Sequence, residues 1–563
     1  MSFDKNLRLV LCWHMHQPEY RNLKTDEFVL PWTYLHAIKD YVDMVAHLEN
    51  CPDAKAVVNF SPILLEQIEA YAQQLQLFLL NGHQIKDPLL AALSGSAIAT
   101  DKNARLQIIS SCKKANRERQ IERYSYFAEL VEMSDWLESH PQAIQYIDNQ
   151  FFFDLLVWYH LAWLGETVKR NNSNIQKLID KASGFTIEDR FHLIEIIYEL
   201  INNVLGRYKV LAEKGQIELS VTPFAHPIMP LLLDLQSARE AMPDVQLPAI
   251  DYYPGGEERV RWHLQHGIEV FQRCFGFKPD GCWPSEGSLS EQTLQILSEL
   301  GFKWTASGGN VLRNSLKASG QEQQIIHHPF QLKTSDISCF FRDDGLSDLI
   351  GFEYSKWHAD HAVNDLIHHL ENISHYVKED AVVSIIMDGE NAWEYFPENG
   401  YYFLTALYEK LTAHPSIELT TFSDCINSNL KNVPLKKLVA GSWVYGTFST
   451  WVGDKDKNRG WEMLADAKAV FDNVIAKGQL SQQRVDEAKK QLAICEGSDW
   501  FWWFGDYNPD DAVSSFEKQF RLNLRNLYDL LAVEWPEYLS LSFAHGSGAP
   551  DMGGAMRRGN MNQ

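Results

Sequence analysis

The chain has 563 residues, more than one hydrophobic core usually organises, so we expect two or three structural units. Hydrophobic residues make up 45% and charged residues 22% of the sequence, a balance that excludes wholesale disorder. The net charge of −23 repels phosphate backbones and anionic membrane surfaces, so we expect neither a nucleic acid nor a membrane as a partner.

The N-terminal sequence MSFDKNLRLVLCWHMH lacks the basic segment, long apolar core and cleavage site of a secretory signal. No later segment offers about 18 uninterrupted apolar residues, the length that a membrane-spanning helix needs. Eight cysteines are scattered without any CxxC pair, as expected for buried thiols that stay reduced. We therefore expect a cytoplasmic protein.

Short apolar segments typical of buried strands alternate with helical patterns over residues 1–425. The predicted strands are residues 8–14, 56–61, 217–223, 281–284, 302–307, 339–343, 381–388 and 417–424. The helical patterns lie at residues 33–49, 62–79, 289–300, 359–377 and 400–412. Strands that alternate with helices indicate a parallel sheet or a barrel, so residues 1–425 are predicted to form an α/β domain.

Two parts of the chain depart from this alternation. Residues 80–213 form a long helix-like run, which we treat as a helical insertion into the α/β domain. Residues 426–543 contain three amphipathic helical patterns and are predicted to form a C-terminal helical domain. Within it, SDWFWWFGDYN at 498–508 concentrates aromatic side chains, which we expect to pack against the α/β domain and complete the cleft. Residues 544–563 are rich in glycine and methionine and are predicted to be a flexible tail.

Polar side chains lie at or just beyond the ends of several predicted strands. They are His14, His16 and Gln17 at the end of the first strand, His226 beyond the third, Glu286 beyond the fourth, Arg342 and Asp343 at the end of the sixth, and Asp388 and Glu390 at the end of the seventh. In a barrel the carboxyl ends of the strands face one pocket. A single site could therefore receive all of these side chains.

Two of these carboxylates form a pair of particular interest. Asp388 ends a run of Val, Ser, Ile and Met residues that contains no compensating charge. In that position it is either a helix N-cap or a catalytic group whose pKa is raised by burial. Glu286 stands in CWPSEGSLS, where Ser288 or Ser290 could cap the next helix instead. Two carboxyl groups at neighbouring strand ends are what the cleavage of a glycosidic bond requires. The pair is more informative than either member.

Five stretches, in order along the chain, carry a family resemblance. They are HMHQP at 14–18, GQIELSVTPFAHPIMPLL at 215–232, CWPSEGSLS at 282–290, MDGENAWEYF at 387–396 and GSWVYGTFSTWVG at 441–453. They resemble the ordered motif regions of glycoside hydrolase family 57, and the last two look more like its amylopullulanase and α-amylase branch than its branching-enzyme branch. The resemblance implies a distorted (β/α)7 barrel followed by an α-helical bundle, which acts on α-glucans and retains the anomeric configuration.

Carried over to this chain, the resemblance implies that Glu286 is the nucleophile and Asp388 the general acid/base. We expect their carboxyl groups to lie roughly 5–5.5 Å apart, the separation typical of retaining enzymes. The remaining polar candidates are expected to bind substrate. They are His14, His16 and Gln17, placed against a glucose ring next to the scissile bond, His226, placed against the same sugar, and Glu390.

Alternation along a strand puts His14 and His16 on one face, an arrangement that also suits a metal and resembles the start of zinc α-mannosidases. The residues that follow, Gln17 and Pro18, do not include the acidic zinc ligand of those enzymes. We therefore expect no metal and no cofactor. A strand-end histidine whose hydrogen bonds the backbone satisfies is a further alternative, more for His14 than for His16.

Arg342 and Asp343 are expected to orient the nucleophile through a charge-assisted bond, although a salt bridge at the barrel rim would look identical in sequence. Four tryptophans are candidate platforms on which sugar rings could stack. They are Trp283, Trp393, Trp443 and Trp451, and Trp393 is favoured because it lies near Asp388 in the sequence.

These observations favour a retaining hydrolase of the α-1,4-glucosidic bonds, and of some α-1,6 bonds, in starch, glycogen or maltodextrin. The same two carboxylates would serve a 4-α-glucanotransferase or a glucan branching enzyme, in which another glucan replaces water. A catalytically silent glucan-binding protein is a weaker alternative, because a silent protein has no chemical need for both carboxylates. A zinc-dependent hydrolase is the fourth.

Overall fold

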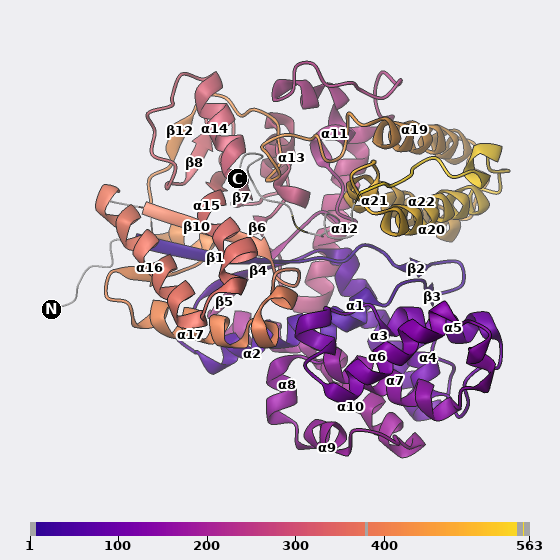
Figure 1. Ribbon diagram of the computed structural model, residues 1–563. Helices are drawn as coiled ribbons and strands as arrows, with labels where there is room; N and C mark the ends of the chain where they lie inside the picture. The colour runs from indigo at the N-terminus through magenta and orange to yellow at the C-terminus, as the bar shows by residue number, and fades with distance from the viewer. Residues whose placement is uncertain (1–6, 378–380, 429, 549–555, 557–563) are drawn as a thin grey trace.

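The computed structural model describes residues 7–377, 381–428, 430–548 and 556 and shows a barrel with helical units on two sides (Figure 1). Strand β1 (Leu7–Met15) pairs in parallel with β10 (Ala381–Asp388) on one side and with β4 (Ala56–Phe60) on the other. These strands are buried along nearly their whole length, as expected for strands covered on both faces. Their almost continuous apolar runs follow from this burial.

Seven parallel strands form the barrel wall. Their order is β10, β1, β4, β5 (Ile217–Val221), β6 (Gly281–Cys282), β7 (Trp304–Ser307) and β9 (Ser338–Phe341). A single bridge between Arg342, just after β9, and Ser384 of β10 returns the last strand to the first. The predicted distorted (β/α)7 barrel is confirmed. Its distortion lies at the very short β6 and at this one-bridge closure.

Further short strands lie outside the ring. β11 (Ile417–Leu419) pairs with the start of β1, and β8 (Phe330–Leu332) pairs antiparallel with β9. β12 (Val433–Leu435) pairs with β8, so the sheet extends past residue 425, the predicted end of the α/β domain. A separate ribbon joins β2 (Arg21–Asn22) to β3 (Glu27–Phe28).

Helices follow the strands of the barrel along the chain. These are α1 (Trp32–His36), α2 (Val42–Asn50), α3 (Pro62–Asn81), α11 (Met229–Leu233), α12 (Gly256–Phe275), α13 (Glu291–Glu299), α14 (Gly309–Ala318), α15 (Asp344–Asp348), α16 (Ala359–Tyr376), α17 (Tyr401–Ala413) and α18 (Phe422–Asn427). Each helical pattern predicted from the sequence of this domain is present. The first of them divides into α1 and α2, which a π-helical turn over Ala37–Tyr41 joins.

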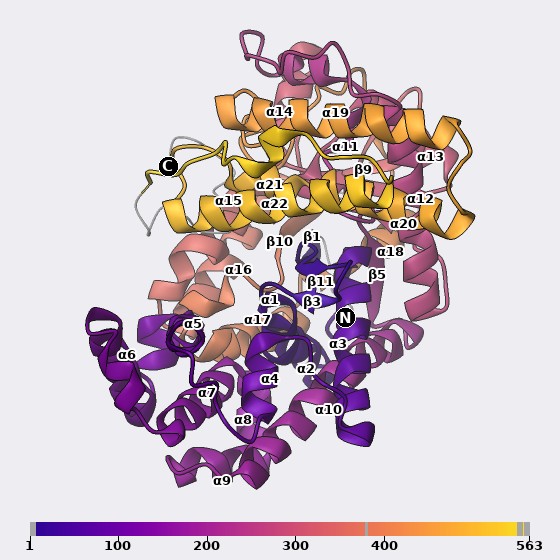
Figure 2. The ribbon, with the colours of Figure 1, turned by 90° about the vertical axis from the view of Figure 1, so that its right-hand side faces the viewer.

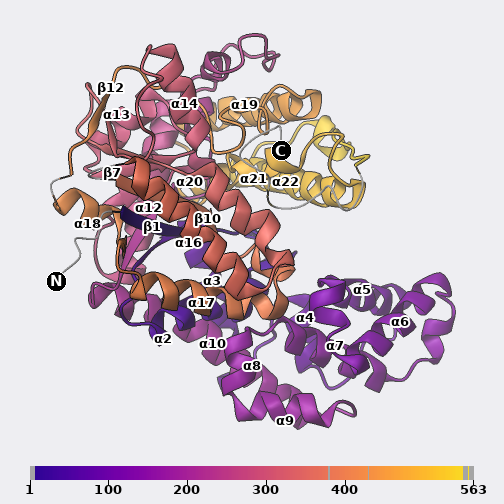
Figure 3. The same ribbon diagram turned by 60° about the vertical axis from the view of Figure 1, so that its left-hand side comes forward.

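The helical insertion leaves the barrel after α3 and returns through α10 (Ile187–Glu213), which packs against α3. Its other helices are α4 (Pro88–Ser94), α5 (Lys102–Cys112), α6 (Ser125–Ser139), α7 (Asn149–Trp163), α8 (Glu166–Asn171) and α9 (Ser173–Lys181). They form a lobe that projects from the barrel (Figure 3).

The C-terminal helical domain lies on a different side of the barrel from the insertion, and Figure 2 shows α19 and α22 running side by side there. Its helices are α19 (Lys455–Ala476), α20 (Gln482–Cys495), α21 (Ser498–Trp503) and α22 (Asp510–Leu530). The predicted flexible tail, residues 544–563, falls mostly outside the described residues. Within the part of the chain that the structure describes, no helix is both long and apolar enough to cross a membrane.

Candidate active site

The carboxyl ends of the barrel strands bring the predicted polar side chains together. In the parallel register, His14 of β1 lies opposite Asp388 of β10 and opposite Asn59 of β4. His226 follows β5, and Glu286 follows β6, at the same end of the barrel. These five side chains therefore surround one site.

Asp388 ends β10, and its side chain lines a pocket. Burial raises the pKa of this carboxyl to about 6, against a hydrogen bond from Asn391 and the electrostatic influence of His16 and Arg342, which lower it. The Asn391 amide donates to Asp388 Oδ2 over 2.9 Å. A carboxyl with this pKa can lose and regain a proton near neutral pH, as a general acid/base must.

Glu286 lies in a turn with an unusual backbone. Its φ of 57° and ψ of 25° are left-handed, a conformation that non-glycine residues seldom adopt and that is frequent at functional sites. Gly287 follows with φ 58°, and a Cβ there would lie 2.8 Å from the Trp283 ring, so the turn requires glycine. The Trp443 indole Nε1 donates to Glu286 Oε2 over 2.9 Å, which holds the carboxylate in one orientation.

His14, His16 and His226 form a cluster of imidazole rings. The ring centroids of His16 and His226 are 3.8 Å apart, and those of His14 and His226 are 5.2 Å apart. Burial, together with the nearby His16, lowers the pKa of His14 to about 3 and that of His226 well below its usual range, so both rings are neutral. His226 Nδ1 also lies 3.9 Å from Glu286 Oε1.

The contacts of the two neutral rings fix their tautomers. His14 Nδ1 lies 2.7 Å from the Asn59 side-chain oxygen, which only accepts, so this nitrogen carries the proton. His14 Nε2 must then accept from His226 Nε2, 3.2 Å away. His226 Nδ1 in turn accepts from the Ser498 hydroxyl over 2.8 Å. A directed chain of hydrogen bonds therefore runs from Ser498 through both histidines to Asn59.

Two residues of α21, in the C-terminal domain, reach this cluster. Besides its hydroxyl contact, Ser498 donates its backbone N–H to the His226 carbonyl over 2.9 Å. Asp499 lies 2.9 Å from His16 Nε2, and Ser61 lies 2.7 Å from His16 Nδ1. Sequence reasoning missed Ser498 and Asp499 as site residues. The available signal was the aromatic stretch 498–508, which predicted packing against the barrel without naming these two side chains.

Glu390 and Gln17 lie behind the cluster. Glu390 Oε1 accepts from the His16 backbone N–H and from Gln17 Nε2, each over 3.2 Å. Burial and the negative charge of Asp388 raise the pKa of Glu390 well above its usual range, which favours the protonated carboxyl. Glu390 is 2% exposed and Gln17 is 7% exposed, so little of either side chain is open to a substrate. Both contribute mainly by holding neighbouring residues of the site in place.

Arg342 and Asp343 take part in the structure of the barrel rim. Arg342 is buried and donates to Asp344 over 3.1 Å and to Asp348 over 2.9 Å. Asp343 accepts from His327 over 2.8 Å and caps α15. These contacts favour the rim salt bridge over the expected bond that orients the nucleophile. Glu286 instead accepts a hydrogen bond that the sequence did not predict, the one from the Trp443 indole.

The expected stacking role is wrong for three of the four tryptophans. Trp283, Trp393 and Trp451 are 0% exposed, so no face of their rings is open to a sugar. Trp393, the favoured candidate, turns into the core and donates its indole N–H to the Gly389 carbonyl. Trp443 does lie in the site, where its indole binds Glu286.

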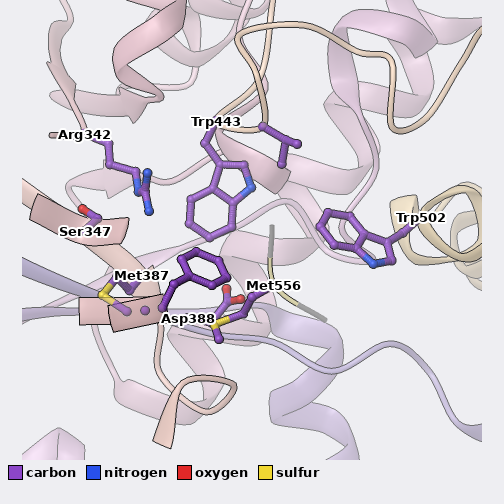
Figure 4. Close-up of a pocket in the computed structure, with 10 residues that line it drawn as sticks. Arg342, Ser347, Met387, Asp388, Trp443, Trp502 and Met556 are labelled. Carbon is purple, nitrogen blue, oxygen red and sulfur yellow. The ribbon is translucent and has the colours of Figure 1, made fainter. Parts of the chain in front are cut away.

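A pocket opens beside Asp388 (Figure 4). Trp443 forms one wall above Asp388, and Trp502 of α21 enters from the C-terminal domain. Phe352 and Met387 add further apolar surface. The pocket thus combines one carboxyl that can exchange a proton with aromatic walls, a composition that suits a sugar.

One group of side chains among the described residues could hold a cation. His16, His226 and Asp499 each offer a donor atom, and these atoms lie within 4.8 Å of one another. The ring nitrogens of both histidines already have protein partners, so an ion would have to break hydrogen bonds that now satisfy them. The cluster is complete as a hydrogen-bonded unit.

Comparison with known proteins identifies the family. Residues 10–439 match Glycosyl hydrolase family 57, and comparison with curated proteins gave no match. A branching enzyme of this family from the hyperthermophilic archaeon Thermococcus kodakaraensis superposes with a TM-score of 0.56 and 14% identity, over 96% of this chain and 92% of that one.

Two further solved structures share the fold. For the α-amylase AmyC from Thermotoga maritima the TM-score is 0.56 and the identity 13%, over 95% of each chain. For a 4-α-glucanotransferase from Thermococcus litoralis the TM-score is 0.50 and the identity 15%, over 93% of this chain and 60% of that one. The family match covers most of the chain, and the barrel and helical domain agree with it. The chain belongs to glycosyl hydrolase family 57.

Proposed function

We propose that the protein cleaves α-1,4-glucosidic bonds of starch, glycogen or maltodextrin by double displacement, with retention of configuration. The observation that carries this proposal is the position of Trp443, which contacts one carboxyl and shares a pocket with the other. Its indole donates to Glu286, and its ring lines the pocket beside Asp388. Neighbours described as a branching enzyme, an α-amylase and a 4-α-glucanotransferase support an α-glucan as the substrate.

In the first step the Glu286 carboxylate attacks the anomeric carbon while Asp388 gives its proton to the departing glycosidic oxygen. The sugar is then bonded to Glu286, and Asp388 is ionised. In the second step Asp388 takes a proton from water, whose oxygen attacks the anomeric carbon and releases Glu286. The raised pKa of Asp388 suits it to both roles.

His16 is the histidine that we place against the substrate. Its side chain is 10% exposed, whereas those of His14 and His226 are almost fully covered. The two covered rings act behind it, since neutral stacked imidazoles hold His16 and the Glu286 side of the site in position.

Transfer of the glycosyl group to another glucan, as in a 4-α-glucanotransferase or a branching enzyme, is a second candidate. The apolar walls of the pocket beside Asp388 favour it. Phe352, Trp443 and Trp502 offer aromatic surface to an acceptor sugar and restrict the access of water to the acid/base.

Products formed from maltoheptaose test the proposal, with reducing ends and chain lengths followed together and Glu286→Gln as the inactive control. Shorter oligomers with rising reducing ends, absent in the variant, support hydrolysis. Longer and shorter products at constant reducing ends support transfer. Unchanged maltoheptaose would refute both. Pullulan as a second substrate tests cleavage of α-1,6 bonds and the expected amylopullulanase character.

We further propose that the protein acts in the cytoplasm. All eight cysteines are free thiols, which supports a reducing compartment. Trapping of thiols in intact cells, followed by mass spectrometry, should find every cysteine reduced. A disulfide in the trapped protein would contradict this location.

A further inference from the structure

A buried ion pair joins the C-terminal domain to the barrel next to the site. Glu496 directly follows α20, and its carboxylate accepts two hydrogen bonds from Arg259 of α12. Arg259 Nε donates to Oε1 and Nη2 donates to Oε2, each over 2.8 Å. Tyr253 donates to the same carboxylate over 2.6 Å, and His263 lies 2.8 Å from it. Glu496, Arg259 and His263 are all at most 2% exposed.

Glu496 and Arg259 form an ion pair, and His263 contacts the same carboxylate. Burial alone would raise the pKa of Glu496, but the charge of Arg259 and the hydrogen bond from His263 outweigh it and lower the pKa to about 2. Burial lowers the pKa of His263, so its ring is neutral. Its Nε2–H then donates to Glu496, which leaves Nδ1 to accept from the Ala225 backbone N–H over 3.3 Å.

The group of Glu496, Arg259 and His263 therefore contacts two segments that meet at the site. On the barrel side, His263 accepts a hydrogen bond from Ala225, the residue before His226. The backbone of His226 has a φ of 59°, a strained conformation that its surroundings must enforce. On the other side, Glu496 begins the segment Gly497–Ser498–Asp499. A Cβ at Gly497 would lie 3.0 Å from the Ala225 carbonyl oxygen, which shows how closely the two segments approach.

We propose that Glu496, with Arg259 and His263, is a positioning group that holds Ser498 and Asp499 on the histidine cluster and thereby sets its tautomers. Only Gly497 separates Glu496 from Ser498 in the sequence. Ser498 is the first donor of the hydrogen-bond chain that runs through His226 and His14. The effect on turnover rests on the proposed function. The effect on the histidines does not.

Selective ¹⁵N labelling of histidine, read by long-range ¹H–¹⁵N NMR, reports the tautomer of His226 and the hydrogen bonds of the His16 ring nitrogens without any substrate. Assignments come from single histidine substitutions. Ser498→Ala and Asp499→Asn define the signals of a cluster that has lost its C-terminal partners. In Glu496→Gln, we expect the signals of His16 and His226 to move toward those of these two variants.

Two further variants keep the test decisive. Glu496→Gln leaves Arg259 buried without its counterion and could unfold, so the double variant Glu496→Leu with Arg259→Met replaces the pair by apolar groups, which buried pairs often tolerate. It should give the same shifts. Glu517→Gln is the matched control, because Glu517 is buried and paired with Arg521 inside the C-terminal domain. It should leave the histidine signals unchanged.

Turnover of maltoheptaose provides the second measurement. A displacement of about 1 Å at a site lowers turnover by about 100-fold, so we expect a fall in kcat of this order in Glu496→Gln with a smaller change in KM. Combining Glu496→Gln with Asp499→Asn should lower kcat little beyond Asp499→Asn alone, because both act on the same contact.

The outcomes separate the two proposals. If Glu496→Gln and the double variant lose thermal stability but keep the wild-type signals of His16 and His226, the ion pair is only structural and this inference is refuted. If the signals move and the wild-type protein leaves every α-glucan intact, the positioning role stands and the proposed function fails.

Discussion

Replacement of Glu390 by glutamine should change the protein little, although Glu390 lies two residues from the proposed acid/base. Burial and the charge of Asp388 raise the pKa of the Glu390 carboxyl well above its usual range, so we expect it to be protonated at neutral pH. Its Oε1 serves as an acceptor for His16 and Gln17. A protonated carboxyl and an amide have nearly the same shape and no charge, so the substituted side chain in Glu390→Gln is a close copy of the native one.

The expected magnitudes follow from these contacts. The amide oxygen of Glu390→Gln keeps both acceptor contacts, and the extra buried N–H destabilises the fold by about 1–3 kcal/mol at most. Glu390→Ala instead leaves the His16 N–H and the Gln17 amide without their acceptor, at about 1–3 kcal/mol for each. Because the side chain at position 390 is neutral in both the wild-type protein and Glu390→Gln, the pKa of Asp388 should stay near 6 in the variant.

The assay is the pH dependence of kcat on maltoheptaose, with Asp388→Asn as the inactive control. The raised pKa means that Asp388 holds its proton below about pH 6 and loses it as the pH rises, so kcat should fall on the alkaline side in both proteins. A fall of that apparent pKa by about 1 or more in Glu390→Gln would mean that Glu390 had been ionised, since a neighbouring negative charge keeps a proton on Asp388. That result would refute the reasoning.

Three other predictions can be tested with single changes. Trp443→Phe removes the hydrogen bond to Glu286, worth about 1.5–3 kcal/mol for a charged acceptor, so kcat/KM should fall about 10- to 150-fold; a fall below about threefold would contradict the orienting role. Gly287→Ala forces a Cβ toward Trp283 at a left-handed φ and should destabilise the fold by about 2–5 kcal/mol in urea unfolding, whereas Gly206→Ala, in open space on α10, should not destabilise it. Dialysis against EDTA should leave turnover unchanged, because hydrogen bonds already satisfy His16, His226 and Asp499; lost activity that zinc restores would show a metal site.

The sequence predicted those parts of the fold whose pattern reflects burial. Residues 381–388 were predicted as a strand with the correct ends, because both faces of β10 are covered and every position before Asp388 is buried. The strand at 281–284 proved to be two residues long, since the chain turns at Pro284 toward the left-handed Glu286. Such a turn leaves no periodic pattern in the sequence.

The site was predictable where it depends on strand ends and not where it depends on side-chain direction. Glu286 and Asp388 could be paired because both follow strands of one barrel. Trp393 could not be assigned correctly, because only tertiary packing decides whether an indole faces the core or the pocket. Asp499 meets His16 across 483 positions of sequence, a contact for which local patterns carry no information.

The proposed catalytic pair and part of the pocket wall come from different segments of the chain. Glu286 and Asp388 lie within residues 10–439, which match the family, whereas Trp443 and Trp502 follow that segment. In the proposed function the two carboxyls belong to the barrel, and the surface that an acceptor would meet combines Phe352 of the matched segment with Trp443 and Trp502 beyond it.

We infer that Trp502, from α21, biases the glycosyl-enzyme toward a sugar acceptor by covering the pocket with an aromatic face. Trp502→Ala should raise the number of reducing ends formed per maltoheptaose consumed, because water then enters more freely and an acceptor binds less well. An unchanged ratio at wild-type stability would place the choice between water and sugar within the barrel itself.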